Sequence, residues 1–277
     1  MNNRRSFITG VKGTKLNNKE IEFLIKYKHW GIILFSRNLH NIKQIKTLTK
    51  HIRKIFRDKN YPIMIDQEGG RVNRLNKFIS IDHLTSEYFG KLYIKDKRQF
   101  NLFFKLFIDK TSRILLDLGI NINTVPVLDL KYKGSSRIIG DRSYSNNPKI
   151  VSKIGNICIK HFSNNSIATV VKHIPGHGLA KVDSHHFTPT IDKSLNFLKK
   201  NDFWIVGLDN NSNTEIQTVP SDLKKVIILG SENKGIKKLL LENCDFRVKI
   251  RIKKSKFVDS LNVSNAAAIS LFEFRKK

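Results

Sequence analysis

The feature that most constrains the fold is a repeated alternation of short apolar runs and amphipathic stretches along residues 7–171. Residues 31–35, Gly-Ile-Ile-Leu-Phe, are apolar on both faces, as expected of a strand buried in a parallel sheet. Residues 42–56 then place apolar side chains at helical spacing. Because parallel strands need long crossover connections, which helices usually supply, the alternation predicts an α/β fold with a parallel sheet.

The same criteria predict the other elements of this region. Strands are expected over residues 7–9, 31–35, 62–65, 122–127 and 168–171, and helices over residues 20–27, 42–56, 97–118 and 148–162. Asn18 is the expected N-cap of the first helix. In barrels built from such units, the catalytic residues follow the strands directly, so polar residues at these positions are the first candidates for a site.

The charge of the chain leaves two interpretations open. Lys and Arg number 51 against 23 Asp and Glu, a formal net charge of +28, which is typical of proteins that bind nucleic acid or another polyanion. The charge is spread, with 35 basic and 14 acidic residues in 1–195 and 16 and 9 in 196–277. Lys, Ile and Asn are frequent throughout, as in AT-rich genomes, so coding bias explains much of the excess and is the favoured interpretation, with polyanion binding as the alternative.

Cysteine content and hydropathy predict the compartment. Cys158 and Cys244 provide neither a disulfide framework nor a thiolate metal site, which suits a reducing environment. The apolar run in residues 6–16 is too short and too often interrupted by glycine for a secretory signal, and no run approaches a membrane span. We therefore expect a soluble, cytoplasmic protein with no membrane partner, while its oligomeric state stays open.

Polar clusters recur just after the predicted strands. They comprise residues 36–38, residues 66–74, Asp129 with Asp141 and Arg142 beyond it, and Lys172 with His173. Each cluster alone has a plain structural interpretation as a turn, a solvated face or a helix cap. Their recurrence at successive strand ends instead favours one shared site.

Residues 172–186, Lys-His-Ile-Pro-Gly-His-Gly-Leu-Ala-Lys-Val-Asp-Ser-His-His, form the richest of these loops. Asp183 stands two residues before His185, close enough for its carboxylate to fix the imidazole tautomer, as a general acid/base histidine requires. Three interpretations remain: a catalytic loop that handles a sugar or phosphate, structural histidines, or a zinc site formed by His173, His177, Asp183 and His185. The spacing fits no standard zinc motif, so no metal is expected.

Four motifs carry a family resemblance. ILFSRN at 33–38, IDQEGGRVNRL at 65–75, GDRSY at 140–144 and KHIPGHGLAKVDSHH at 172–186 closely resemble the NagZ-type β-N-acetylglucosaminidases of glycoside hydrolase family 3. The resemblance spans about residues 6–195. It implies a (β/α)8 TIM barrel that hydrolyses cell-wall muropeptide sugars in the cytoplasm, with retention of configuration and without a cofactor.

The resemblance also assigns roles. It implies that the N-acetylglucosamine ring is held by Asp66, Arg74, Arg142, Lys172 and His173. His185 would be the general acid/base, oriented by Asp183. A retaining enzyme also needs an anionic nucleophile, which in this family belongs to an Asp-Asp pair after a later strand. No such pair occurs after residue 195, so we expect an incomplete barrel and impaired hydrolysis.

Residues 196–277 continue with motifs of another kind. Strands are expected over 203–209, 226–229 and 247–252, and helices over 236–243 and 264–274. FWIVGLD, VIILGSENKGIKKLLLENCD and VDSLNVSNAAAISLFE resemble the C-terminal half of SpoU-type (TrmH-like) RNA ribose 2′-O-methyltransferases. That likeness implies a trefoil knot that binds S-adenosylmethionine and acts on RNA. It assigns the cofactor and active site to Gly230, Glu232, Ile250, Ser260, Leu261 and Asn262.

The second resemblance is incomplete. IRIKKSKFVDS at 250–260 replaces the family's usual Ile-Pro-Met-Gly segment, and the first motif, with its catalytic Arg, has no counterpart. We therefore predict two parts, a truncated family 3 barrel over 1–195 and a partial methyltransferase over 196–277. Three functions stay open: an impaired glycosidase, an RNA methyltransferase, and a chimeric fusion with no function.

Overall fold

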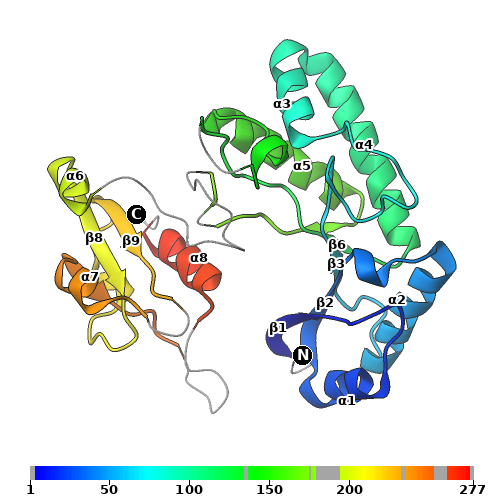
Figure 1. The fold of residues 1–277 in the computed structure, drawn as a ribbon, viewed down its shortest axis with the longest axis horizontal. Helices are drawn as coiled ribbons and strands as arrows, with labels where there is room; N and C mark the ends of the chain where they lie inside the picture. Colours follow the sequence, from blue (N-terminus) through cyan, green and yellow to red (C-terminus); the bar gives the residue numbers. More distant parts are fainter. Residues whose placement is uncertain are drawn as a thin grey trace. The chain divides into compact units, whose positions relative to one another are not determined.

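The structure, a computed structural model, describes residues 4–133, 137–174, 176–178, 194–231, 235–252 and 261–274. The chain divides into two compact units, Met1–Pro189 and Thr190–Lys277 (Figure 1). This division falls a few residues before the predicted boundary at residue 195.

The first unit contains one parallel sheet of five strands. The strands are β1 (Arg5–Gly10), β2 (His29–Leu34), β3 (Ile63–Ile65), β6 (Ile122–Asn123) and β7 (Ala168–Thr169). Their order in the sheet, β1-β2-β3-β6-β7, follows the chain, and Figure 1 shows the first four side by side. The α/β class with a parallel sheet is therefore confirmed. Within the described residues β7 pairs only with β6, so the sheet is open there.

Five helices connect these strands. They are α1 (Asn18–Tyr27), α2 (Ile42–Phe56), α3 (Ser86–Lys95), α4 (Lys97–Asp117) and α5 (Pro148–Asn164). A short antiparallel hairpin, β4 (Gln67–Gly69) with β5 (Val72–Asn73), follows β3 directly. Single 3-10 turns occupy Ser36–Asn38 and Gly140–Arg142.

The sheet and helices share one apolar core. Ile45, Leu48 and Ile52, spaced by three and four residues along α2, are buried on a single helix face. Ile63 and Ile65 of β3 are fully buried in the same cluster. Burying each of these side chains stabilises the fold by about 1.5–3 kcal/mol before the loss of conformational entropy is subtracted.

Some predicted element ends need correction. Asn17, not Asn18, caps α1: its side chain accepts a hydrogen bond from the Glu20 amide, and the Glu20 carboxylate accepts one from the Asn17 amide. The strand predicted over 122–127 ends at Asn123. Pro126 lacks an amide hydrogen and cannot extend the ladder, and pairing resumes only as a bridge between Val127 and Lys172.

Helix α3 was not predicted from the sequence. Thr85 caps the helix by accepting a hydrogen bond from the Tyr88 amide. The negative charge of Glu87 in the first turn interacts favourably with the helix dipole. The Thr-Ser-Glu signal was therefore present, but the helix has only 10 residues and weak apolar periodicity.

The second unit has its own three-stranded parallel sheet, in the order β10-β8-β9. Its elements are α6 (Leu195–Lys200), β8 (Phe203–Leu208), a 3-10 turn (Ile216–Thr218), β9 (Lys224–Ile228), α7 (Lys238–Glu242), β10 (Phe246–Val248) and α8 (Val263–Glu273). A separate small core forms around Val206, Ile216, Val219 and Val248. In the part of the chain that the structure describes, no helix of either unit has the length and apolarity to cross a membrane.

Candidate active site

The residues that follow three adjacent strands lie close together at one edge of the first unit's sheet. Asp66 follows β3, Thr124 follows β6 and Lys172 lies just beyond β7. Lys172 Nζ lies 3.0 Å from Asp66 Oδ1 and 3.0 Å from Thr124 Oγ1, and the Thr124 hydroxyl also donates to Asp66. Since parallel strands end at the same edge, chain segments 106 residues apart converge on one polar cluster.

Glu68 extends the cluster towards Arg142. The Arg142 guanidinium donates from Nε to Glu68 Oε2 at 2.8 Å and from Nη2 to Oε1 at 2.9 Å, a bidentate pair. Lys172 Nζ also lies 2.6 Å from Glu68 Oε1. Arg74 reaches Asp66 at 3.4 Å. We call these five charged residues the polar network.

Both carboxyl groups of the polar network are held ionised. Burial by itself would raise the pKa of Asp66, but Lys172, Thr124 and Arg74 lower that pKa on balance. Burial likewise opposes ionisation of Glu68, and its pairs with Arg142 and Lys172 lower its pKa below the usual value. Two ionised carboxylates paired with three cations can bind hydroxyl and amide groups of a ligand. Because both carboxyl groups are ionised, neither is suited to act as a proton donor.

Asp129 organises a second cluster beside the first. It is buried, its Oδ2 lies 2.6 Å from His173 Nδ1, and the His173 amide donates to the same oxygen at 3.1 Å. The His177 amide donates to the other oxygen. Burial works against ionisation of Asp129, yet these hydrogen bonds lower its pKa. Asp129 thus fixes the start of the loop over 172–186, and the helix-cap interpretation of this residue is wrong.

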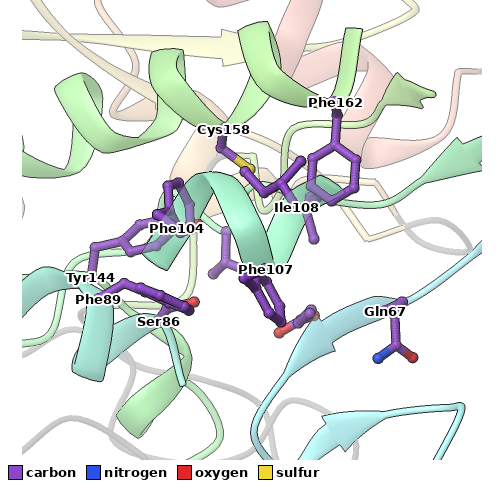
Figure 2. A pocket seen from close by; sticks show the side chains of 12 residues that line it. Gln67, Ser86, Phe89, Phe104, Phe107, Ile108, Tyr144, Cys158 and Phe162 are labelled. Carbon is purple, nitrogen blue, oxygen red and sulfur yellow. The ribbon is translucent and has the colours of Figure 1, made fainter. Parts of the chain in front are cut away.

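Aromatic core residues pack next to Glu68 of the polar network. A small cavity of about 10 Å³ lies among α3, α4, α5 and β4. Figure 2 shows the polar side chains of Gln67 and Ser86 on opposite sides of this cavity, with the Phe107 ring between them and the rings of Phe89 and Phe104 near Ser86. Glu68 and Tyr144 also line this cavity. Because the cavity is so small, the core around Glu68 is tightly packed, which limits the movement of this side chain.

The structure brings together most of the sugar-binding residues proposed from sequence. Asp66, Arg74, Arg142 and Lys172 belong to the polar network, whereas His173 binds Asp129 instead. Asp183 and His185 lie outside the described residues, so the predicted acid/base pair stays a prediction. No group of three or more His, Cys, Asp or Glu suited to a metal occurs among the residues that are described.

Sequence reasoning did not assign roles to Thr124, Glu68 or Asp129. Glu68 lies within the quoted motif at 65–75, and Asp129 follows a predicted strand, so both carried a positional signal. Thr124 carried none, because a threonine after a short strand is common and its contacts with Asp66 and Lys172 form only in the folded chain.

In the second unit, Gly230 lies two residues after the end of β9, and its backbone approaches that of Gly235 closely. A Cβ atom on Gly230 would lie 2.4 Å from the Gly235 carbonyl carbon, so only glycine fits this turn. Ile250 lines a polar hollow of about 380 Å³, together with Asn210, Asn213, Glu215, Lys249, Arg251 and Ile252. Asn262 caps α8 by accepting from the Ser264 amide, and Leu261 precedes it. Glu232, Ser260 and residues 253–259 of the IRIKKSKFVDS segment lie outside the described residues.

Comparison with known proteins decides the family of the first unit. Residues 6–206 match the glycosyl hydrolase family 3 N terminal domain. This chain belongs to glycosyl hydrolase family 3. The family 3 chain is 34% identical over 175 residues to a β-hexosaminidase of Hydrogenovibrio crunogenus and 32% identical over 204 residues to one of Neisseria gonorrhoeae.

The family 3 chain spans about half the length of these relatives. The matches cover 63% and 72% of it but only 48% and 55% of the two β-hexosaminidases. Native NagZ from Neisseria gonorrhoeae superposes with a TM-score of 0.63 at 30% identity, covering 71% of this chain and 57% of that one. The same NagZ has also been solved in complex with N-trifluoroacetyl-D-glucosamine.

The C-terminal part matches a different family. Residues 153–272 match the SpoU rRNA Methylase family, overlapping the family 3 match between residues 153 and 206. The predicted likeness to two families, in this order along the chain, is therefore confirmed.

Proposed function

We propose that this protein binds N-acetylglucosamine residues of cell-wall muropeptides at the polar network and is an impaired β-N-acetylhexosaminidase of cytoplasmic peptidoglycan recycling. The observation that carries the proposal is the convergence of Asp66, Lys172 and the Glu68–Arg142 pair at the carboxyl ends of adjacent strands. The binding of an N-acyl glucosamine by NagZ of Neisseria gonorrhoeae supports this substrate class.

The polar network offers complementary groups for a sugar ring. The ionised oxygens of Asp66 accept hydrogen bonds from ring hydroxyls, and Lys172 and Arg74 donate to ring oxygens. Arg74 Nε is buried and has no hydrogen-bond partner within the described residues. A bound sugar would satisfy this donor, which otherwise costs about 1–3 kcal/mol.

Hydrolysis needs two further groups. We propose that His185, oriented by Asp183, protonates the leaving oxygen, since the loop that holds both begins at the Asp129 cluster. An anionic nucleophile must attack the anomeric carbon from the opposite face. In the family, the nucleophile follows a later barrel strand. The corresponding part of this chain, residues 196–277, contains no Asp-Asp pair. The glycosyl-enzyme intermediate therefore cannot form in the usual way.

Chemical rescue tests this proposal directly. We expect the full chain to release dinitrophenolate from 2,4-dinitrophenyl N-acetyl-β-glucosaminide at a rate near the uncatalysed one. Added azide should accelerate the release by at least about tenfold, because a small anion can attack in place of the missing carboxylate. The product should be the glycosyl azide of inverted configuration, identified by NMR.

Lys172→Met and His185→Ala separate binding from chemistry. Lys172→Met should abolish both ligand binding and azide rescue. His185→Ala should leave binding and rescue of the dinitrophenyl substrate intact, since this leaving group needs no proton. Fast turnover by the unaltered chain without azide would show a complete enzyme and refute impairment.

A second candidate function concerns the second unit. The hollow beside Ile250 presents amide, carboxylate and ammonium groups that fit the polar parts of S-adenosylmethionine. The bound cofactor would supply a methyl group for RNA. Because the sequence has no counterpart of the family's catalytic Arg, we propose binding of the cofactor rather than efficient methyl transfer.

Isothermal titration with S-adenosylmethionine tests the second candidate. Saturable binding that Ile250→Asp weakens by more than about tenfold would support it. If the titration with S-adenosylmethionine gives no heat and the first unit binds no sugar, the third interpretation remains, a fusion without function.

A further inference from the structure

The first unit has a wide basic groove on the side of the sheet away from the polar network. The groove has a volume of about 590 Å³ and is lined mainly by the C-terminal turns of α2 and α4 and by the segments that follow them. Those segments lead into the amino ends of β3 and β6, whereas the polar network follows their carboxyl ends. The groove and the candidate active site therefore lie at opposite edges of one sheet.

Positive charge dominates the lining. The groove is lined by six cationic residues, Lys46, Lys50, Arg53, Lys54, Arg57 and Lys59, and by two acidic ones, Asp58 and Asp117. Both carboxylates are already engaged: Asp117 pairs with Lys46 at 2.6 Å, and Asp58 pairs with Arg4, which is not part of the lining. Lys50, Arg53, Lys54, Arg57 and Lys59 form no ion pair within the described residues.

Helix dipoles account for only part of this charge. Basic residues favour helix C-termini, where the backbone carries about half a negative charge. Two helix ends together offset about one positive charge, so the lining keeps a surplus of about three. The groove is more basic than helix capping requires.

Arg53 is the residue that points to a ligand. Its Nε is buried and donates no hydrogen bond within the described part of the chain. Burial lowers the pKa of its guanidinium, and Asp58 counteracts this only in part. Because the attraction of Asp58 offsets the cost of burial only in part, a phosphate bound in the groove would supply a further anion, to which a guanidinium can donate two parallel hydrogen bonds.

We propose that this groove binds the phosphodiester backbone of RNA. Its cationic side chains can contact phosphate groups, which carry no sequence information, so the binding is expected to be independent of base sequence. Cationic residues make up half of the twelve lining residues, and Leu116 is the exposed large apolar one, whereas a membrane-surface site usually presents several exposed apolar side chains, so a polyanionic backbone fits the groove better than a membrane. The proposal does not depend on the second unit or on glycosidase activity.

Two matched triple variants of the full chain test the proposal by fluorescence anisotropy. The probe is a fluorescein-labelled oligouridylate of roughly 20 nucleotides. Lys50→Gln, Lys54→Gln and Lys59→Gln together remove three exposed groove charges. Lys149→Gln, Lys153→Gln and Lys160→Gln together remove three exposed charges from α5, which does not line the groove. The two variants have equal net charge.

The groove variant should lose at least about tenfold in affinity at about 50 mM salt. The slope of log affinity against log salt should also become shallower by about two, as expected from three lost phosphate contacts to a single strand. The α5 variant should change less than about twofold. Arg53→Lys should weaken binding, because lysine keeps the charge but loses the paired donors.

Three results would overturn the proposal. Equal losses in both triple variants would mean that only net charge matters. No binding of oligouridylate by the unaltered chain would exclude the site outright. Binding to vesicles of phosphatidylglycerol and phosphatidylcholine, with no binding to RNA and with loss in the groove variant, would assign the groove to a membrane surface.

Discussion

At the scale of single residues, His29 couples stability to pH. It is fully buried at the start of β2, its Nε2 lies 3.0 Å from Thr9 Oγ1, and its ring stacks on Phe7. Burial lowers its pKa from 6.5 to about 4. Between these values the unfolded chain binds a proton that the folded chain excludes, so this contribution to stability is present above pH 6.5 and is lost as pH falls towards 4.

We expect the free energy of unfolding to fall by about 2 kcal/mol between pH 7 and pH 5 because of this histidine. His29→Phe should remove most of that pH dependence in urea titrations at the two pH values. His51→Gln, which changes an exposed histidine of α2, should retain it. An unchanged pH dependence in His29→Phe would contradict the assignment.

The buried pair of Glu68 and Arg142 makes a second pH prediction, in a more acidic range. Their side chains are only 3% and 14% exposed, so Arg142→Leu leaves a buried carboxylate short of a partner and should cost about 3 kcal/mol at pH 7. The pKa of Glu68 is lowered by this pair, so the difference from the unaltered chain should shrink as pH falls and Glu68 becomes protonated. Guanidinium unfolding at pH 7 and pH 4 measures both quantities.

An exposed ion pair provides the comparison. Lys105→Gln removes the partner of Asp109 on the surface of α4 and should cost less than about 1 kcal/mol at either pH. If Arg142→Leu costs no more than this control, the Glu68–Arg142 pair does not hold the network together.

At the scale of elements, the site depends on how closely α3 approaches the loop that carries Arg142. A Cβ atom on Gly90 of α3 would lie 1.7 Å from the backbone oxygen of Tyr144. Gly90→Ala must therefore push the helix and the loop apart, and we expect a loss of about 2–3 kcal/mol by chemical unfolding, together with weaker sugar binding. Gly13→Ala, with no atom within 4 Å, should be neutral in both measurements.

At the scale of the whole molecule, two separate cores predict two unfolding transitions. The first unit has an extended buried cluster, whereas the second is centred on four buried apolar residues, so the second should unfold at lower denaturant. Ile216→Ala should shift only the earlier transition and Ile65→Ala only the later one, each by about 2–4 kcal/mol. A single transition shifted by both substitutions would show one cooperative unit.

Periodicity in the sequence predicted most elements but not all of their ends. The helix over 42–56 was predicted at its observed bounds from its strong apolar face, and the structure adds that Asn41 caps it. The strands at 122–127 and 168–171 were predicted too long, since their pairing depends on neighbours far along the chain. Helix α3 was missed because its packing, rather than its own pattern, stabilises it.

The sequence by itself determined the α/β class and the two-family order, because hydrophobic periodicity and short motifs are local properties of the chain. Only the tertiary structure decided that Thr124 and Glu68 join Asp66 and Lys172, and that Asp129 holds His173. It also placed around one groove five cations that form no ion pair with any of the described residues. These are long-range arrangements, and contact between side chains so far apart along the chain exists only once the strands have paired and the core has packed.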